Sequence, residues 1–453
     1  MESTVSKFDQ DNIIVVETED QVQVVDFDSV WPRSDPFGMT TPEDDKTERR
    51  VFNGDAAVSA AVLALSHKEP FATIVFTSFE PGPDPSSPMM PQQQRNRTGR
   101  IPVSELDKLK ERLEQANFKV KNWNLATEEK APDPEPNTQN IYIFLPPAPP
   151  AQQSPWQRMP QQEKEFGEAE LAKVRQVLEK ENARAIFLAC FLPPQRSSMF
   201  MPPMPATYGY DKLLRDEWGI DVKFSERVIR GVPDKRGNDR YGLSVTRWNW
   251  MRLNTFNEKH PVGEPLRARR VLMVDVCPVV QAAKVPEHVQ IETVLGVPAP
   301  EGRSEFWAEG KIEDLIRQIQ APNSDGTVTK GPSAVDPPFT VILAAENTQK
   351  KSRIVVSGAG LSVIDSYMDE RVPRLGQEEK ISFDPPPREN GDLLVNCAYW
   401  LADKPDYIAA GPVIAPPVES ISSGNRRLLQ VLVVAWAVFV LAAGMVMWSI
   451  RRK

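Results

Sequence analysis

Cys190 stands where a catalytic nucleophile could be placed, because it closes the apolar stretch ARAIFLACFL at residues 183–192. A nucleophile elbow puts Ser or Cys at the end of a strand and needs small residues on both sides of it. Here Phe191 and Leu192 follow directly, and no His-x-Glu or His-x-Asp pair occurs downstream to activate a thiol. A hydrolase that uses Cys190 as its nucleophile is therefore the remote alternative.

The other residue types that could do chemistry show no supporting pattern. Gly-x-x-x-x-Gly-Lys-Ser/Thr is absent, and the SGAG at 357–360 lacks the third glycine of a dinucleotide fingerprint, so it is interpreted as a tight turn. The chain's three cysteines and three histidines show no ligand spacing: Cys190, Cys277, Cys397, His67, His260 and His288. The cysteines lie in apolar runs and are interpreted as small buried residues. We expect no metal, no cofactor and no enzymatic activity.

The elements that would position a site alternate between strand and helix from residue 51 to about 230. Amphipathic helices are predicted at 103–118 and 167–182, with apolar faces formed by Leu106, Leu109, Leu113 and Ala116, and by Leu171, Val174, Val177 and Leu178. Buried strands are predicted at 72–79, 141–146 and 183–192, and an edge strand at 119–125. This alternation predicts an α/β domain with a mostly parallel sheet and helices on both faces.

The remaining segments complete the predicted organisation. Residues 1–50 contain a β-hairpin, residues 51–404 form the α/β domain with an irregular insertion near 230–265, and residues 405–427 form a Pro/Gly/Ser tether. The alternation resumes after the insertion and ends in a helix with Leu393, Leu394, Cys397, Ala398 and Leu401 on its buried side. Proline is frequent, at 43 residues, and its clusters near 81–102, 146–162 and 193–206 are interpreted as long surface loops.

A ligand site, if the domain has one, is expected at the carboxyl edge of the sheet, where open α/β sheets bind ligands. Thr77, Ser78 and Ser357 end predicted strands there. This expectation rests on analogy with that fold class.

The C-terminal segment is predicted to cross a membrane. Residues 428–450 contain no charge, and Arg426 and Arg427 precede them, while Arg451, Arg452 and Lys453 follow. About 20 apolar residues suffice to span a bilayer as a helix. The first dozen residues are polar, which predicts no signal peptide.

The net negative charge of residues 1–425 argues against nucleic acid as a partner. The whole chain has a formal charge of −8, and the five basic residues from Arg426 onwards leave −13 on residues 1–425. Phosphate binding requires clustered lysine and arginine.

Several phrases, in order, resemble the auxiliary component of gliding-motility-type ABC transport systems. They are FNGDAAVSAAVLALSHKEPFATIVFT, VSELDKLKERLEQANFKVKNWNLAT, YGYDKLLRDEWGIDVKFSERVI, KHPVGEPLRARRVLMVDVCPVV, EFWAEG, SRIVVSGAGLSV and ENGDLLVNCAYWLADKPDYIAAGP. The resemblance covers about residues 13–450. Ala359 and Gly360 stand where that family has an acidic Asp-Ser-Asp pattern, and Met1 stands just ahead of the hairpin where the family has a first membrane helix.

This resemblance implies an intraflagellar-transport-like domain, similar in fold to class I glutamine amidotransferases. It implies no catalytic residues. It implies an ATPase and a permease as partners, and a bacterial inner-membrane location with the main domain outside the cytoplasm. The sequence thus predicts a non-catalytic, membrane-anchored accessory subunit of an ABC-type transporter. The alternative is a tail-anchored cytoplasmic scaffold that docks partners through its Pro-rich loops.

Overall fold

The structure is a computed structural model that describes residues 13–18, 22–25, 27–31, 54–67, 69–80, 101–146, 166–193, 208–234, 239–243, 250–267, 271–321, 326–368, 372–375, 381–384 and 389–408. The predicted membrane segment with its basic flanks, the tether beyond Ile408 and nearly all of the Pro-rich clusters lie outside these residues. Among the described helices, none is long and apolar enough to cross a membrane.

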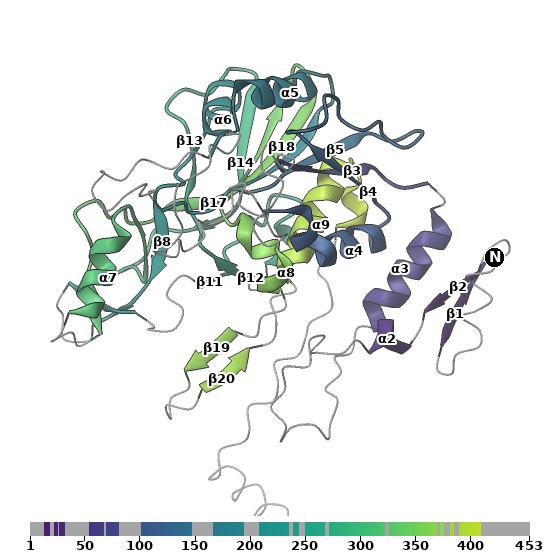
Figure 1. Ribbon diagram of the computed structural model, residues 1–453. Helices are drawn as coiled ribbons and strands as arrows, with labels where there is room; N and C mark the ends of the chain where they lie inside the picture. Colours follow the sequence, from purple (N-terminus) through teal and green to yellow (C-terminus); the bar gives the residue numbers. More distant parts are fainter. Residues whose placement is uncertain are drawn as a thin grey trace, which may run out of the picture. The chain divides into compact units, whose positions relative to one another are not determined.

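A seven-stranded sheet forms the centre of the α/β domain (Figure 1). Its strands, in spatial order, are β14 (Val289–Val297), β17 (Phe339–Asn347), β18 (Ser352–Ser357), β6 (Arg184–Leu188), β5 (Asn140–Phe144), β3 (Thr73–Ser78) and β4 (Lys119–Asn124). The four pairings from β18 to β4 are parallel, and the two that join β14, β17 and β18 are antiparallel. The predicted mostly parallel sheet is confirmed, and β4 is an edge strand as its alternating sequence indicated.

Two strands of the alternating part of the chain lie outside this sheet. The strand that follows the helix DKLLRDEW is β7 (Ile220–Val222), which pairs with β13 (Val279–Gln281) in a separate ladder. The strand VLMV is β12 (Val271–Val274), which pairs with β11 (Trp250–Leu253). Local periodicity specifies that a segment is a strand but does not specify its partner, which depends on contacts distant in sequence.

Helices cover both faces of the sheet, as predicted. The described helices are α2 (Phe27–Val30), α3 (Gly54–Ser66), α4 (Asp107–Gln115), α5 (Glu168–Leu178), α6 (Asp211–Trp218), α7 (Ile312–Gln320), α8 (Asp365–Met368) and α9 (Glu389–Leu401). The chain moves from β3 to β4 in one direction along the sheet and from β5 to β6 in the other. Because such crossovers are right-handed, α4 and α5 lie on opposite faces, and α9 packs beside α4 (Figure 1).

The apolar faces of these helices are buried as their spacing predicted. Leu106, Leu109, Leu113 and Ala116 are buried along α4 and its flanks; Leu171, Val174, Val177 and Leu178 are buried on α5; Leu393, Leu394, Cys397, Ala398 and Leu401 are buried on α9. Gly219 ends α6 in the left-handed conformation, with φ of 65°, and its amide donates to the carbonyl oxygen of Leu214.

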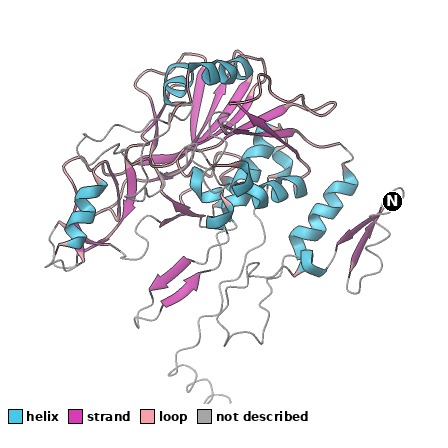
Figure 2. Cartoon of the chain, viewed as in Figure 1, coloured by secondary structure: helices cyan, strands magenta, loops and turns pink. Residues whose placement is uncertain are grey.

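Short antiparallel ladders make up the predicted irregular insertion and its surroundings (Figure 2). β10 (Arg240–Gly242) pairs with β9 (Val232–Pro233) and with β16 (Thr327–Thr329), and β8 (Arg227–Arg230) pairs with β15 (Phe306–Glu309). β19 (Val372–Leu375) pairs with β20 (Ile381–Asp384). The expected N-terminal hairpin is present as β1 (Ile14–Glu17) and β2 (Val22–Val25). Single-turn helices complete the described elements: η3 (Val103–Leu106), η4 (Glu264–Leu266), η5 (Gly360–Val363) and η6 (Pro405–Tyr407).

One buried histidine links the stability of the fold to pH. His260 is 1 % exposed; its Nδ1 accepts a hydrogen bond from the amide of Val262 at 3.2 Å, and its ring lies 5.1 Å from that of Trp400. Burial, with a smaller contribution from the positive charge of Arg353, lowers the pKa of His260 from 6.5 to about 4. The folded state therefore keeps this imidazole neutral at pH values where the unfolded chain protonates it.

We expect the free energy of unfolding to fall as the pH drops from about 6.5 towards 4. Above pH 6.5 both states are neutral at this residue, and below it only the unfolded state gains the proton, which removes about 3 kcal/mol by pH 4. His260→Gln retains an acceptor for Val262 but does not titrate, so its urea unfolding curves should depend less on pH than those of the wild type. Identical pH slopes for the two proteins would contradict this linkage.

Candidate functional site

The carboxyl edge of the sheet collects the ends of β3, β5, β6 and β18, because these strands run parallel. Thr77 and Ser78 end β3, and Ser357 ends β18, so all three expected ligand residues lie at this edge. However, β5 and β6 lie between the two strands. Three strand spacings separate Ser357 from the β3 pair by about 14 Å, so the three residues do not form one compact site.

At the end of β3, the side chain of Thr77 bonds to the protein itself. Thr77 and Ser78 are buried, and the hydroxyl of Thr77 donates to the carbonyl oxygen of Val75 at 3.3 Å. The chain leaving β3 is held by Asn124 at the end of β4: its Nδ2 donates to the carbonyl oxygen of Glu80 at 2.7 Å, and its Oδ1 accepts from the amide of Glu80 at 3.0 Å. This role of Asn124 was not predicted, although its place at the end of a predicted strand was an available signal.

At the end of β18, the amides of the SGAG turn are already in use. Gly358 donates to the carbonyl oxygen of Val341 at 2.8 Å, Ala359 donates to the Oγ of Ser357 at 3.2 Å, and Gly360 donates to the carbonyl oxygen of Ala189 at 2.6 Å. A phosphate loop needs amides that point at the ligand. All three amides of this turn instead close the end of the sheet, in agreement with its interpretation as a tight turn.

Cys190 follows β6 at the same edge and has no exposed surface. The two bulky residues after it, Phe191 and Leu192, are also buried. The amide of Phe191 donates to the carbonyl oxygen of Asp275 at 2.8 Å, which ties this segment to the chain that leaves β12.

An ion pair that the sequence did not reveal lies beside this cysteine segment. Arg227 pairs with the carboxylate of Asp275, and its guanidinium lies 5.3 Å from the ring centre of Phe191. Burial lowers the pKa of Arg227 to about 10, while the nearby Tyr367 acts in the opposite direction. Both residues stand in segments that read as ordinary strands, FSERVIR and LMVDVCP, so no local signal marked them.

The chain's three histidines lie at the opposite, amino edge of the sheet. His67 precedes β3 and its Nε2 is 2.5 Å from the hydroxyl of Tyr407, while the ring of His260 packs at a tilt against that of Trp400 at the end of α9. The carbonyl of His288 accepts from Thr348, just after β17 ends. The length of β6, about 13 Å from its first to its last residue, separates that edge from Cys190. The structure therefore does not bring a histidine to this thiol.

A metal centre is not assembled within the described ranges either. No group of three or more His, Cys, Asp or Glu side chains among these residues is arranged to hold an ion. The best-buried carboxylate with a full set of donors is that of Glu309, which accepts from the amides of Lys311 and Gly331 and from the hydroxyl of Ser333. These donors explain its burial without an ion.

We expect all three cysteines to be unreactive towards thiol reagents in the folded protein. All are buried, and burial raises the pKa of Cys277 and raises that of Cys397 to about 12, so neither forms the reactive thiolate at ordinary pH. After treatment with a maleimide, intact-mass spectrometry should show no label on the native chain. In about 8 M urea, which unfolds the protein, it should show three labels per chain. Rapid native labelling at Cys190 would show that the carboxyl edge opens to solvent.

Comparison with known proteins adds no family to this description. No protein-family model matches the sequence. No curated protein matches it either.

Proposed function

We propose that this chain is a non-catalytic, membrane-anchored accessory subunit of an ABC-type transport system. Its α/β domain, which we propose is glutamine-amidotransferase-like, binds partner subunits or substrate, and residues 428–450 anchor it in the bilayer. The main domain lies outside the cytoplasm of a bacterial cell, beside the inner membrane. The partner class comes from the resemblance of ordered phrases such as EFWAEG and SRIVVSGAGLSV to that family.

The observation that supports a binding role rather than a catalytic role is the closure of the carboxyl edge among the residues that the structure describes. Nucleophilic catalysis at this edge would need an exposed nucleophile at a strand end and a base within hydrogen-bond reach. Cys190 has no exposed surface, the turn after β18 uses its own amides, and the histidines lie at the other edge. These features support a domain whose sheet edge is part of the folded core.

Purification of the full-length chain from native membranes in mild detergent tests the partner class. The expected result is co-purification of an ATPase and a permease in fixed ratio. A chain that lacks residues 428–450 is the matched control and should lose both partners together with the membrane. Recovery of the chain without any transporter subunit would overturn the proposal, and recovery of cytoplasmic proteins alone would favour the scaffold alternative.

Protease accessibility tests the side of the membrane independently of the partners. Protease added to intact spheroplasts should digest the α/β domain, and protease added to inverted inner-membrane vesicles should leave it intact. The reverse pattern would place the domain in the cytoplasm and would contradict the proposed orientation. The retained or lost partner subunits then report separately on the transporter role.

A further inference from the structure

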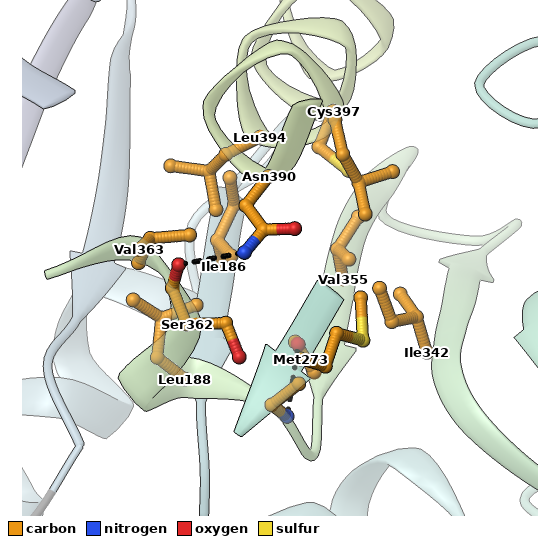
Figure 3. Close-up of a pocket in the computed structure, with 13 residues that line it drawn as sticks. Ile186, Leu188, Met273, Ile342, Val355, Ser362, Val363, Asn390, Leu394 and Cys397 are labelled. Carbon is orange, nitrogen blue, oxygen red and sulfur yellow. Dashed lines mark hydrogen bonds between the residues drawn. The ribbon is translucent and has the colours of Figure 1, made fainter. Parts of the chain in front are cut away.

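A small internal cavity lies between the sheet and α9, under the turn that follows β18 (Figure 3). Its volume is about 20 Å³, and its wall is mostly apolar. The wall includes Ile186 of β6, Val355 of β18, Met273 of β12 and Leu394 of α9. This volume is large enough for one water molecule, because a cavity needs at least about 10–15 Å³ to hold one.

One polar atom in this wall has no partner. Asn390, in the first turn of α9, is 2 % exposed, and its buried Oδ1 has no hydrogen-bond partner among the residues that the structure describes. Leaving a buried amide oxygen unpaired costs about 1–3 kcal/mol, so native proteins rarely do so.

The hydrogen bonds of Nδ2 fix the orientation of the Asn390 side-chain amide. Its Nδ2 donates to the carbonyl oxygens of Leu272 at 2.7 Å and Ser362 at 2.9 Å, the second of which is drawn in Figure 3. Exchanging the positions of nitrogen and oxygen would set Oδ1 against two carbonyl oxygens, so the network itself assigns the orientation. The unpaired atom is therefore an acceptor that requires a donor.

Two hydroxyl groups in the same wall require an acceptor for their protons. The Oγ of Ser357 accepts from the amide of Ala359, and the Oγ of Ser362 accepts from the amide of Val274 at 2.9 Å. Within the described part of the chain, neither hydroxyl donates its own proton to a protein acceptor. The wall thus offers one unused acceptor and two unused donors.

We infer that this cavity binds one structural water molecule. The water donates a hydrogen bond to Oδ1 of Asn390 and accepts from the hydroxyl of Ser357 or Ser362, which uses both kinds of unpaired group. Buried waters typically make about three hydrogen bonds, so this donor and acceptor set suits one. The bound water would join the start of α9 to the turn after β18. This inference is independent of the proposed function.

A crystal structure of the full-length wild-type chain at high resolution, with and without xenon pressure, tests the site directly. The expected result is one ordered water within hydrogen-bond distance of Oδ1 of Asn390 and no xenon in the cavity. A dry apolar cavity binds xenon. A cavity that contains no water density would overturn the inference, whether or not it takes up xenon.

Magnetic relaxation dispersion of water provides a second test in solution. Val355→Ile adds one methyl group at the cavity wall and should remove one long-lived water per chain. Val356→Ile is the matched control, because it makes the same change on the same strand at a residue outside the cavity wall, and it should retain the wild-type number. An equal number of long-lived waters in wild type and Val355→Ile would contradict the inference.

Discussion

Gly358→Ala is expected to destabilise the protein by about 3 kcal/mol or more, because it forces two backbone segments apart. A Cβ at this position would overlap the carbonyl oxygen of Cys277 and would stand 3.1 Å from the carbonyl carbon of that residue. It would also stand 3.1 Å from Cγ2 of Val279. Because the clash is with backbone and not with the end of a flexible side chain, no rotamer change can relieve it.

The same substitution would disturb the hydrogen bonds that close the carboxyl edge. The amide of Cys277 donates to the carbonyl oxygen of Gly358 at 2.9 Å, and the amide of Gly358 donates to Val341 at 2.8 Å. Separating these segments leaves buried backbone groups without partners. The free energy of unfolding, from urea titration followed by tryptophan fluorescence, measures the loss.

Gly302→Ala is the matched control for Gly358→Ala. A Cβ at Gly302 meets nothing within 4 Å, so we expect its stability to stay within about 0.5 kcal/mol of the wild type. If the two variants had the same stability, the close approach of the SGAG turn to the Cys277 segment would not be a feature of the folded protein.

Arg184→Met is expected to cost about 3 kcal/mol, because it removes the buried, charged donor that pairs the carbonyl groups of Leu401 and Lys351. The side chain of Arg184 is 4 % exposed. Its Nε donates to the carbonyl oxygen of Leu401 at 2.8 Å, one Nη donates to the carboxylate of Asp403 at 3.0 Å, and the other Nη donates to the carbonyl oxygen of Lys351. These bonds fasten the end of α9 to the amino edge of the sheet.

Arg317→Met and Arg184→Lys separate this network from a general effect of charge. Arg317 pairs with Asp314 on the surface of α7 with its side chain 77 % exposed, and exposed pairs contribute at most about 1 kcal/mol. Lysine at 184 keeps the charge but cannot reach three acceptors in different directions, so its stability should lie between those of wild type and Arg184→Met. Equal losses in Arg184→Met and Arg317→Met would show that the buried network contributes nothing beyond an exposed pair.

The sequence by itself determined the elements of the α/β domain and the faces they bury. The helix at 103–118 and the strand at 119–125 were predicted from periodicities of 3.6 and 2 residues, and both are present. These patterns are local, because they depend only on which neighbouring side chains must point into the core.

Strand order and direction depended on the tertiary structure. β17 reads as a buried strand, FTVILAAE, yet it runs antiparallel to β18, and the nine-residue β14 beside it was not predicted. A buried strand in a parallel pair and one in an antiparallel pair have the same apolar sequence when both faces are covered. Their direction follows from where the connecting chain can return.

The candidate site also shows which features the sequence determines and which only the tertiary structure decides. The end of each strand could be predicted, so Thr77, Ser78 and Ser357 were expected at one edge. Only the tertiary structure decided that two strands separate them and that Asn390 approaches Ser357 from a helix that follows β18 in the chain. Sequence spacing cannot specify such contacts, because they are set by packing between segments that the chain connects through long detours.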